Sequence, residues 1–175
     1  MIPRRAQLLG FAVLVAGTIT MMVVLKRHGA PLAVGDVSGI RALELAPTAS
    51  AAKNVTDAWS DALKTLAYED IRFDYAFIAL YSTTLAFAGF IGAVVFAGRW
   101  ARLGLVLGWL MWFAGLCDVA ENLGMTAELG GTLSVAPLVC LVSSVKWILT
   151  IVGFVYGIAV LVGIAVRCRS PVISG

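Results

Sequence analysis

Four long apolar segments constrain the fold of this chain more than any other feature of its sequence. They cover residues 7–25, 75–97, 103–123 and 136–166. A helix needs about 20 apolar residues to cross a hydrocarbon core of about 30 Å, and each segment is near or above that length. The chain is 61% apolar and only 13% charged, so it cannot supply the charged surface of a soluble domain. We therefore predict an all-α membrane protein, a four-helix transmembrane bundle that forms a single membrane domain over residues 1–175.

The first apolar segment has the position of a signal peptide, but its flanks favour a retained helix. Its apolar core exceeds the usual ~7–15 residues, and Lys26 and Arg27 follow it in place of a small-residue cleavage site. The formal net charge of +3 is dispersed, which argues against a nucleic-acid partner. The expected partner is the lipid bilayer itself.

The lysines and arginines of the short connections predict the orientation, because such residues collect on the cytoplasmic side of membrane proteins. With a cytoplasmic N-terminus, that side holds Arg4, Arg5, Arg99, Arg102, Arg167 and Arg169. The opposite connection, residues 124–135, contains no Lys or Arg. We predict a multi-pass protein of the cell (inner) membrane with both termini cytoplasmic.

The long first connection, residues 28–73, should contain structure of its own, because long structureless loops are uncommon in compact domains. Pro47-Thr48 is a helix-start pattern. The apolar residues that follow at helical spacing are Val55, Trp59, Ala62 and Leu66. We predict an amphipathic helix over about 48–66, on the outer membrane surface or across the mouth of the bundle. A lid and a simple packing role both stay open for it.

Polar residues interrupt three of the apolar segments at matching depths. With a rise of 1.5 Å per residue, Asp118 lies roughly 22 Å from the inner end of its span, and Lys146 lies roughly 30 Å from the inner end of the next. The upper layer near the outer boundary holds Asp74, Glu121, Asn122 and Lys146, and the lower layer holds Tyr81, Asp118 and Thr150. Polar groups at equal heights on separate helices predict that these seven residues form one binding cluster.

Small residues share the helix faces that carry this cluster. At 100° per residue, Gly104 and Gly108 fall on the same stripe as Asp118, and Gly153 falls on the stripe of Lys146. Small residues four positions apart mark faces where membrane helices pack closely. These faces should turn the polar groups into the bundle. They also allow an alternative role, in which they join copies of the chain into a homo-oligomer.

The charges of the cluster do not balance. Asp74, Asp118 and Glu121 are three carboxylates against one ammonium group, Lys146. Isolated charges are costly at membrane depth, so Lys146 should pair with Asp118 or Glu121. At least one remaining carboxylate must then be protonated, bind a cation or face water.

Each member of the cluster also has a simpler interpretation. Asp74 could be an outer helix-end residue paired with Arg72, and Glu121 and Asn122 could form the solvated end of a short span. Asp118 and Lys146 could form a salt bridge that only fixes helix register. Their coincidence in depth favours a site over these separate explanations.

Other chemistries find little support in the sequence. His28 is the only histidine, so a histidine-rich metal site is excluded in practice, and we expect no metal and no cofactor. A hard cation held by the cluster's oxygen atoms stays open as a ligand. Cys117 and Cys140 both lie in the outer half; a disulfide between them is conceivable, but buried free thiols are favoured.

Three segments carry a resemblance to a known group of proteins. "RFDYAFIALY", "CDVAENLGM" and "SSVKW" contain Asp-x-x-Phe-x-x-x-Tyr, Asp-x-x-Glu-Asn and Lys-Trp. The chain thereby resembles an uncharacterised group of bacterial four-span membrane proteins over roughly residues 37–157. The resemblance implies no activity or cofactor, but it supports placing Asp74, Tyr81, Asp118, Glu121, Asn122 and Lys146 in one site.

Three classes of function stay open, and the sequence leaves enzymatic activity undecided. The first is a binding or transport-like protein whose cluster holds a cation, a proton or a polar lipid head group. The second is a structural or assembly subunit locked by a salt bridge, and the third is a membrane-embedded lipid-modifying enzyme. A functional site predicts a pocket lined by Asp118, Glu121, Asn122 and Lys146, whereas a structural lock predicts a packed core.

Overall fold

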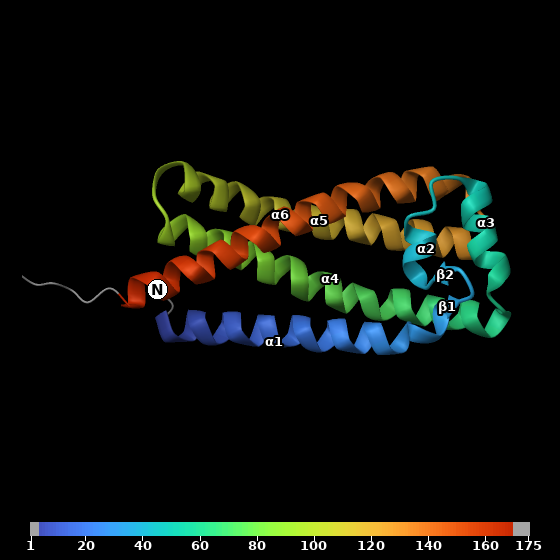
Figure 1. The fold of residues 1–175 in the computed structure, drawn as a ribbon, viewed down its shortest axis with the longest axis horizontal. Coiled ribbons are helices and arrows are strands. Elements are labelled where there is room, and N and C mark those ends of the chain that lie inside the picture. The colour runs from blue at the N-terminus through green and yellow to red at the C-terminus, as the bar shows by residue number, and fades with distance from the viewer. Residues whose placement is uncertain (1–3, 170–175) are drawn as a thin grey trace, which may run out of the picture.

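The computed structural model describes residues 4–169, and almost all of them are helical (Figure 1). The long helices are α1 (Arg4–His28), α4 (Asp61–Val95), α5 (Gly98–Leu129) and α6 (Ala136–Arg169). The shorter elements are η1 (Ala30–Leu32), β1 (Ala33–Val34), β2 (Val37–Ser38), α2 (Ile40–Glu44), α3 (Ala49–Ala58) and η2 (Leu133–Val135). The two short strands pair in antiparallel fashion. The predicted all-α bundle is confirmed.

The four long helices are each long and apolar enough to cross a membrane. All of them extend beyond at least one end of the apolar segment that predicted them, and α4 differs most. It begins at Asp61 rather than near residue 75, so its 35 residues span roughly 52 Å. The apolar pattern marks only the C-terminal part of this helix. Its N-terminal part has one face buried in the cap core, with Ala67 and Ile71.

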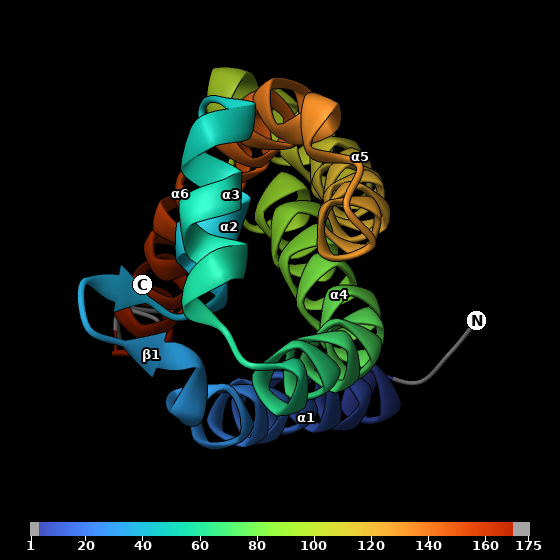
Figure 2. The same cartoon turned by 90° about the vertical axis from the view of Figure 1, so that its right-hand side faces the viewer.

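Residues 29–60 form a cap over one end of the bundle (Figures 1 and 2). Apolar side chains of the cap, among them Leu32, Leu43 and Trp59, form one buried cluster with Ala67 of α4 and Met125 of α5. The Trp59 side chain is 2% exposed, and its Nε1 donates a hydrogen bond to the Leu32 carbonyl oxygen at 2.9 Å. The capped end of the bundle therefore has a packed apolar core of its own.

The amphipathic helix predicted over 48–66 is divided between two helices. Thr48 caps the first turn of α3, which ends at Ala58, and Ser60 caps the start of α4. Trp59 between them is extended (φ −96°, ψ 127°). The chain turns at this break, and the Trp59 side chain packs into the cap core. The Thr48 start was predicted correctly, and the end near residue 66 was wrong.

The end of the bundle opposite the cap is formed by helix ends and one short turn. The start of α1, the end of α6 and the α4–α5 turn lie together at the end opposite the cap (Figure 1). Phe96 and Ala97 alone link α4 to α5. This tight turn requires a positive φ at Gly98 (+60°), a conformation that glycine adopts without strain.

Glycines bring the central helices into close contact. A Cβ atom at Gly89 of α4 would lie 2.7 Å from both the Gly104 carbonyl oxygen and the Gly108 backbone nitrogen of α5. A Cβ atom at Gly153 of α6 would lie 2.2 Å from the Met111 sulfur of α5. The small-residue faces are therefore occupied by contacts within the chain, which position α4, α5 and α6 around the polar residues.

Candidate functional site

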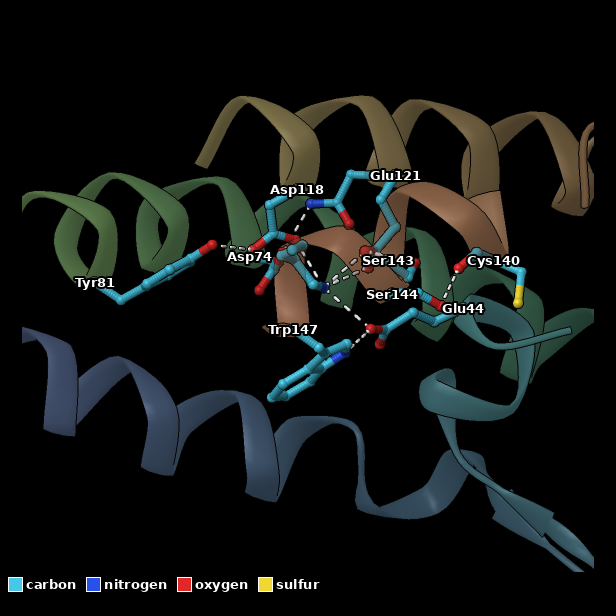
Figure 3. A network of polar contacts seen from close by, with 11 residues as sticks. Glu44, Asp74, Tyr81, Asp118, Glu121, Cys140, Ser143, Ser144 and Trp147 are labelled. Carbon is cyan, nitrogen blue, oxygen red and sulfur yellow. Dashed lines mark hydrogen bonds and ion pairs between the residues drawn. The ribbon is translucent and has the colours of Figure 1, made fainter. Parts of the chain in front are cut away.

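A buried group of polar side chains lies between the helices just below the cap (Figure 3). We call it the Lys146 cluster: Glu44 from α2, Asp74 and Tyr81 from α4, Asp118, Glu121 and Asn122 from α5, and Ser143, Lys146 and Trp147 from α6. The α5 members face inward together because residues three and four positions apart share one face of a helix.

Lys146 lies at the centre of the cluster. Its Nζ lies 2.7 Å from Glu121 Oε2, 2.8 Å from Glu121 Oε1, 3.2 Å from Asp118 Oδ1 and 3.1 Å from Glu44 Oε1. All four side chains are buried, with Lys146 only 7% exposed. Lys146 thus contacts both predicted partners, Asp118 and Glu121, and a third carboxylate, Glu44, which was not predicted.

Hydrogen bonds from neighbouring side chains orient the carboxylates. The Tyr81 hydroxyl donates to Asp118 Oδ2 at 2.8 Å, and the Ser143 hydroxyl donates to Glu121 Oε2 at 2.7 Å. Because these donors hold one oxygen atom of each carboxylate, the side-chain positions around Lys146 are fixed from two sides.

Asp74 belongs to the cluster rather than to a solvated helix end. Its Oδ2 accepts a hydrogen bond from Asn122 Nδ2 at 2.8 Å, and the side chain is only partly exposed. The structure records no ion pair between Asp74 and Arg72 among the residues it describes. Asp74 is therefore the fourth carboxylate of the group, bonded to Asn122, which lies one turn beyond Asp118 on the same face of α5.

Glu44 is the member that sequence reasoning missed. It is the last residue of α2 in the cap and is 5% exposed, and it accepts a hydrogen bond from Trp147 Nε1. No depth could be assigned to Glu44, because it lies in the long connection and outside any apolar span. The only signal was a single acidic residue within the apolar run from Ile40 to Ala46.

Thr150, the remaining predicted member, lies one turn beyond Lys146 on α6. Its hydroxyl oxygen is buried beside Tyr81 and makes no hydrogen bond of acceptable geometry with the residues that the structure describes. The two predicted layers are in fact joined, since Lys146 contacts both Asp118 and Glu121. The predicted depth of Asp118 was counted from residue 103, but α5 begins at Gly98. The five additional residues place Asp118 farther from that end of the helix and close to the depth of Lys146.

The cluster carries more negative than positive charge. Four carboxylates surround or adjoin one ammonium group, so three negative charges are in surplus if every group is ionised. The ammonium group occupies the position that a bound cation would take. Within residues 4–169, no group of three or more His, Cys, Asp or Glu side chains is arranged to hold a metal ion.

Three further features of the capped half of the bundle lie outside the cluster. Cys117 and Cys140 are free, so the conceivable disulfide is not formed. His28 Nδ1 lies 3.1 Å from Asp70 Oδ1 and links α1 to α4. Glu128 of α5 is 1% exposed, and its oxygen atoms have no hydrogen-bond partner among the described residues.

The surface has a depression beside the cluster, but its lining residues are not those of the predicted pocket. It has a volume of about 350 Å³ and is lined by Arg41 and Leu45 from α2 and by Ser144 and Trp147 from α6. The predicted pocket was to be lined by the cluster's own charged members. These are instead packed behind Trp147, whose indole nitrogen bonds Glu44.

Comparisons with known proteins do not assign this site. No protein-family model matches the chain, and no curated protein or solved structure matches it. The argument for a function therefore depends on the geometry described above.

Proposed function

We propose that the protein crosses a membrane four times, with the cap on the outer side, and that the Lys146 cluster binds exchangeable protons there. The length and composition of the four helices support the crossing. Large apolar side chains also cover the bundle surface; Leu116 is 66% exposed and Ile148 is 64% exposed. Such a surface is unfavourable in water but not in contact with lipid chains.

The depth of the cluster follows from helix geometry. From Lys146 to Val166, α6 rises roughly 30 Å, and from Gly98 to Asp118, α5 rises the same distance. This matches the thickness of a hydrocarbon core. The cluster would therefore lie where the hydrocarbon ends on the outer side, with the cap projecting beyond it. The arginine-rich end of the bundle would then be cytoplasmic.

The observation that carries the proposal is the excess of carboxylates around one ammonium group. Lys146 Nζ has Glu44, Asp118 and Glu121 within 3.2 Å, and Asp74 is bonded to Asn122, one turn from Asp118 on α5. Repulsion between carboxylates in a buried site is strong, so positive charge beyond that of Lys146 must be taken up. Protons can supply this charge because, unlike a metal ion, they need no cavity between the carboxylates.

A proton fits this arrangement better than a metal cation does. The ammonium group of Lys146 fills the centre toward which the carboxylates point, and each group is within bonding distance of another. A metal ion would need to displace Lys146 and gather at least six oxygen atoms if it were Ca²⁺. We therefore assign the exchangeable charge to hydrogen ions, in a protein of the binding or transport-like class.

A structural lock is the competing function, because the cluster joins α2, α4, α5 and α6 with buried ion pairs and hydrogen bonds. The packing of its charged members, without a pocket that they line, is the arrangement that a lock predicts. A lock alone has no need of surplus carboxylates, since each adds repulsion and desolvation cost. Functional sites hold such unfavourable charge at some expense of stability. The two functions differ in whether the carboxyl groups carry protons that exchange.

Infrared spectroscopy of the full chain in lipid nanodiscs tests the proposal. Glu128 is buried without a partner, so the measurement uses a Glu128→Gln background that removes its contribution. We expect a protonated-carboxyl C=O band at neutral pH, which Asp118→Asn or Glu121→Gln diminishes. The exposed Asp57 provides the control, because Asp57→Asn should leave the band unchanged.

Three outcomes would contradict the proposal. The first is a cluster without any protonated-carboxyl band at neutral pH. The second is a band that Na⁺ or Ca²⁺ removes on addition, which would make the cluster a cation site instead. A folded, more stable Asp118→Asn protein with an unchanged band would leave only the structural lock.

A further inference from the structure

The depression beside the Lys146 cluster has the chemistry of a lipid head-group site. Arg41 and Leu45 form its cap side, and Ser144 and Trp147 form its α6 side. Trp147 separates it from the buried charges, with the indole ring 5.2 Å from Lys146 Nζ and the indole nitrogen bonded to Glu44. The depression therefore lies at the depth of the cluster, next to its surplus negative charge.

Arg41 supplies a free cationic group at this site. Its guanidinium carbon lies 5.4 Å from the Trp147 ring centroid, and the side chain is exposed. Arg41 makes no ion pair with any carboxylate among the residues that the structure describes. A planar guanidinium group held over an aromatic ring is well suited to bind a phosphate group.

The charge behind Trp147 decides which head group fits. A head group with net negative charge would be attracted by Arg41 but repelled by those carboxylates of the cluster that remain ionised. A zwitterionic head group complements both the positive charge of Arg41 and the negative charge behind Trp147. Its phosphate can lie on Arg41, and its ammonium group can lie over Trp147, facing the carboxylates. We propose that this depression binds a zwitterionic phospholipid of the surrounding bilayer.

The surface below the depression can accept the acyl chains of such a lipid. Ile148, Ile151 and Val155 continue the face of Ser144 along α6 and are 64%, 57% and 61% exposed. They run toward the end of the bundle opposite the cap. In the proposed orientation the head group and the chains thus lie at the depths that they occupy in the outer leaflet. The inference rests on the membrane placement proposed above, and it does not require proton binding.

The chain contains a matched control site. Arg99, Trp100 and Leu103 line a second depression of about 350 Å³ at the opposite end of the bundle. It combines an arginine, a tryptophan and a leucine as the first does, but it lies away from the Lys146 cluster, which is just below the cap. It should therefore show no preference for a zwitterionic over an anionic lipid.

Native mass spectrometry of the full chain, released from detergent with added lipid, tests the inference. The probes are phosphatidylethanolamine and phosphatidylglycerol with identical acyl chains. We expect tighter binding of one phosphatidylethanolamine molecule to the wild type. Arg41→Gln should weaken that binding about fivefold, the effect of losing one partly exposed ion pair, and Arg41→Lys should recover part of it. Arg99→Gln should leave the preference between the two lipids unchanged.

Several results would overturn the inference: equal binding of both lipids by the wild type, unchanged binding by Arg41→Gln, or an equal loss from Arg99→Gln. Circular dichroism and thermal unfolding establish that each variant is folded, as expected for exposed arginines. A protein that shows the protonated-carboxyl band but no lipid preference would refute this inference alone. A lipid preference without that band would refute only the proton-binding proposal.

Discussion

Lys146 is the residue on which the cluster depends. It brings the only positive charge to a buried group of four carboxylates and contacts three of them directly. Removing one partner of a buried ion pair leaves an uncompensated charge, which costs far more than an exposed pair contributes. The hydrogen bonds from Tyr81 and Ser143 stabilise individual carboxylates but supply no charge.

Replacing Lys146 by Met should therefore destabilise the protein by about 3–5 kcal/mol, because Glu44, Asp118 and Glu121 would face one another without the ammonium group. Unfolding in detergent, followed by circular dichroism, measures the change. Adding Glu121→Gln to the Lys146→Met protein should recover much of the loss, since it removes one of the repelling charges.

Lys53 provides the control for this prediction. It forms an exposed ion pair with Asp57 on α3, so Lys53→Met should change stability by only about 0.3–0.5 kcal/mol. If the Lys146 and Lys53 variants melt at the same temperature, Lys146 is solvated and the paired arrangement is wrong.

At the scale of the elements, the contact between α4 and α5 sets the geometry of the cluster. The two helices cross where Gly89 meets Gly104 and Gly108, so their backbones nearly touch. This close approach places Tyr81 of α4 within hydrogen-bond distance of Asp118 of α5. Changes at the glycine contact should therefore affect the cluster from a distance.

Replacing Gly89 by Ala should push α4 and α5 apart, because the added Cβ would lie 2.7 Å from backbone atoms that cannot rotate away. We expect a loss of about 1–3 kcal/mol, the usual cost of overpacking a core. Gly10→Ala on α1 is the control, since a Cβ there meets nothing within 4 Å. Thermal unfolding that ranks the two variants equally would show that the helices are not in close contact at Gly89.

For the whole molecule, the cap and the arginine-bearing α4–α5 turn lie at opposite ends of the bundle. The proposed topology therefore predicts that they lie on opposite sides of the membrane. In a variant without native cysteines, Ser60→Cys should react with a membrane-impermeant maleimide from outside intact cells. Ala97→Cys in the α4–α5 turn should react only after the membrane is opened. Ser170, expected inside from the sequence, lies outside the described residues and serves as a second inner position. Labelling of Ser60→Cys and Ala97→Cys from one side would refute the topology.

The sequence determined the features that depend on local pattern. Hydrophobic length fixed the four long helices, because a helix satisfies its own backbone and apolar runs of this length have few other uses. Helical spacing identified the faces of Asp118 and Asn122. It also grouped six predicted residues that lie together in the structure. Tyr81, Asp118, Glu121 and Lys146 are joined by hydrogen bonds and ion pairs, and Asp74 and Asn122 are bonded to each other beside them.

The tertiary structure decided what depends on contacts between distant segments. Glu44 joins Lys146 across about a hundred residues, and no local pattern encodes that distance. The break at Trp59 combines a local signal, the Ser60 cap of α4, with a tertiary contact, the burial of the Trp59 indole ring in the cap core. The depression beside Trp147 likewise exists only where α2 folds against α6. Local propensity and periodicity place side chains on the faces of helices, whereas the packing of those helices and the cap decides which side chains meet.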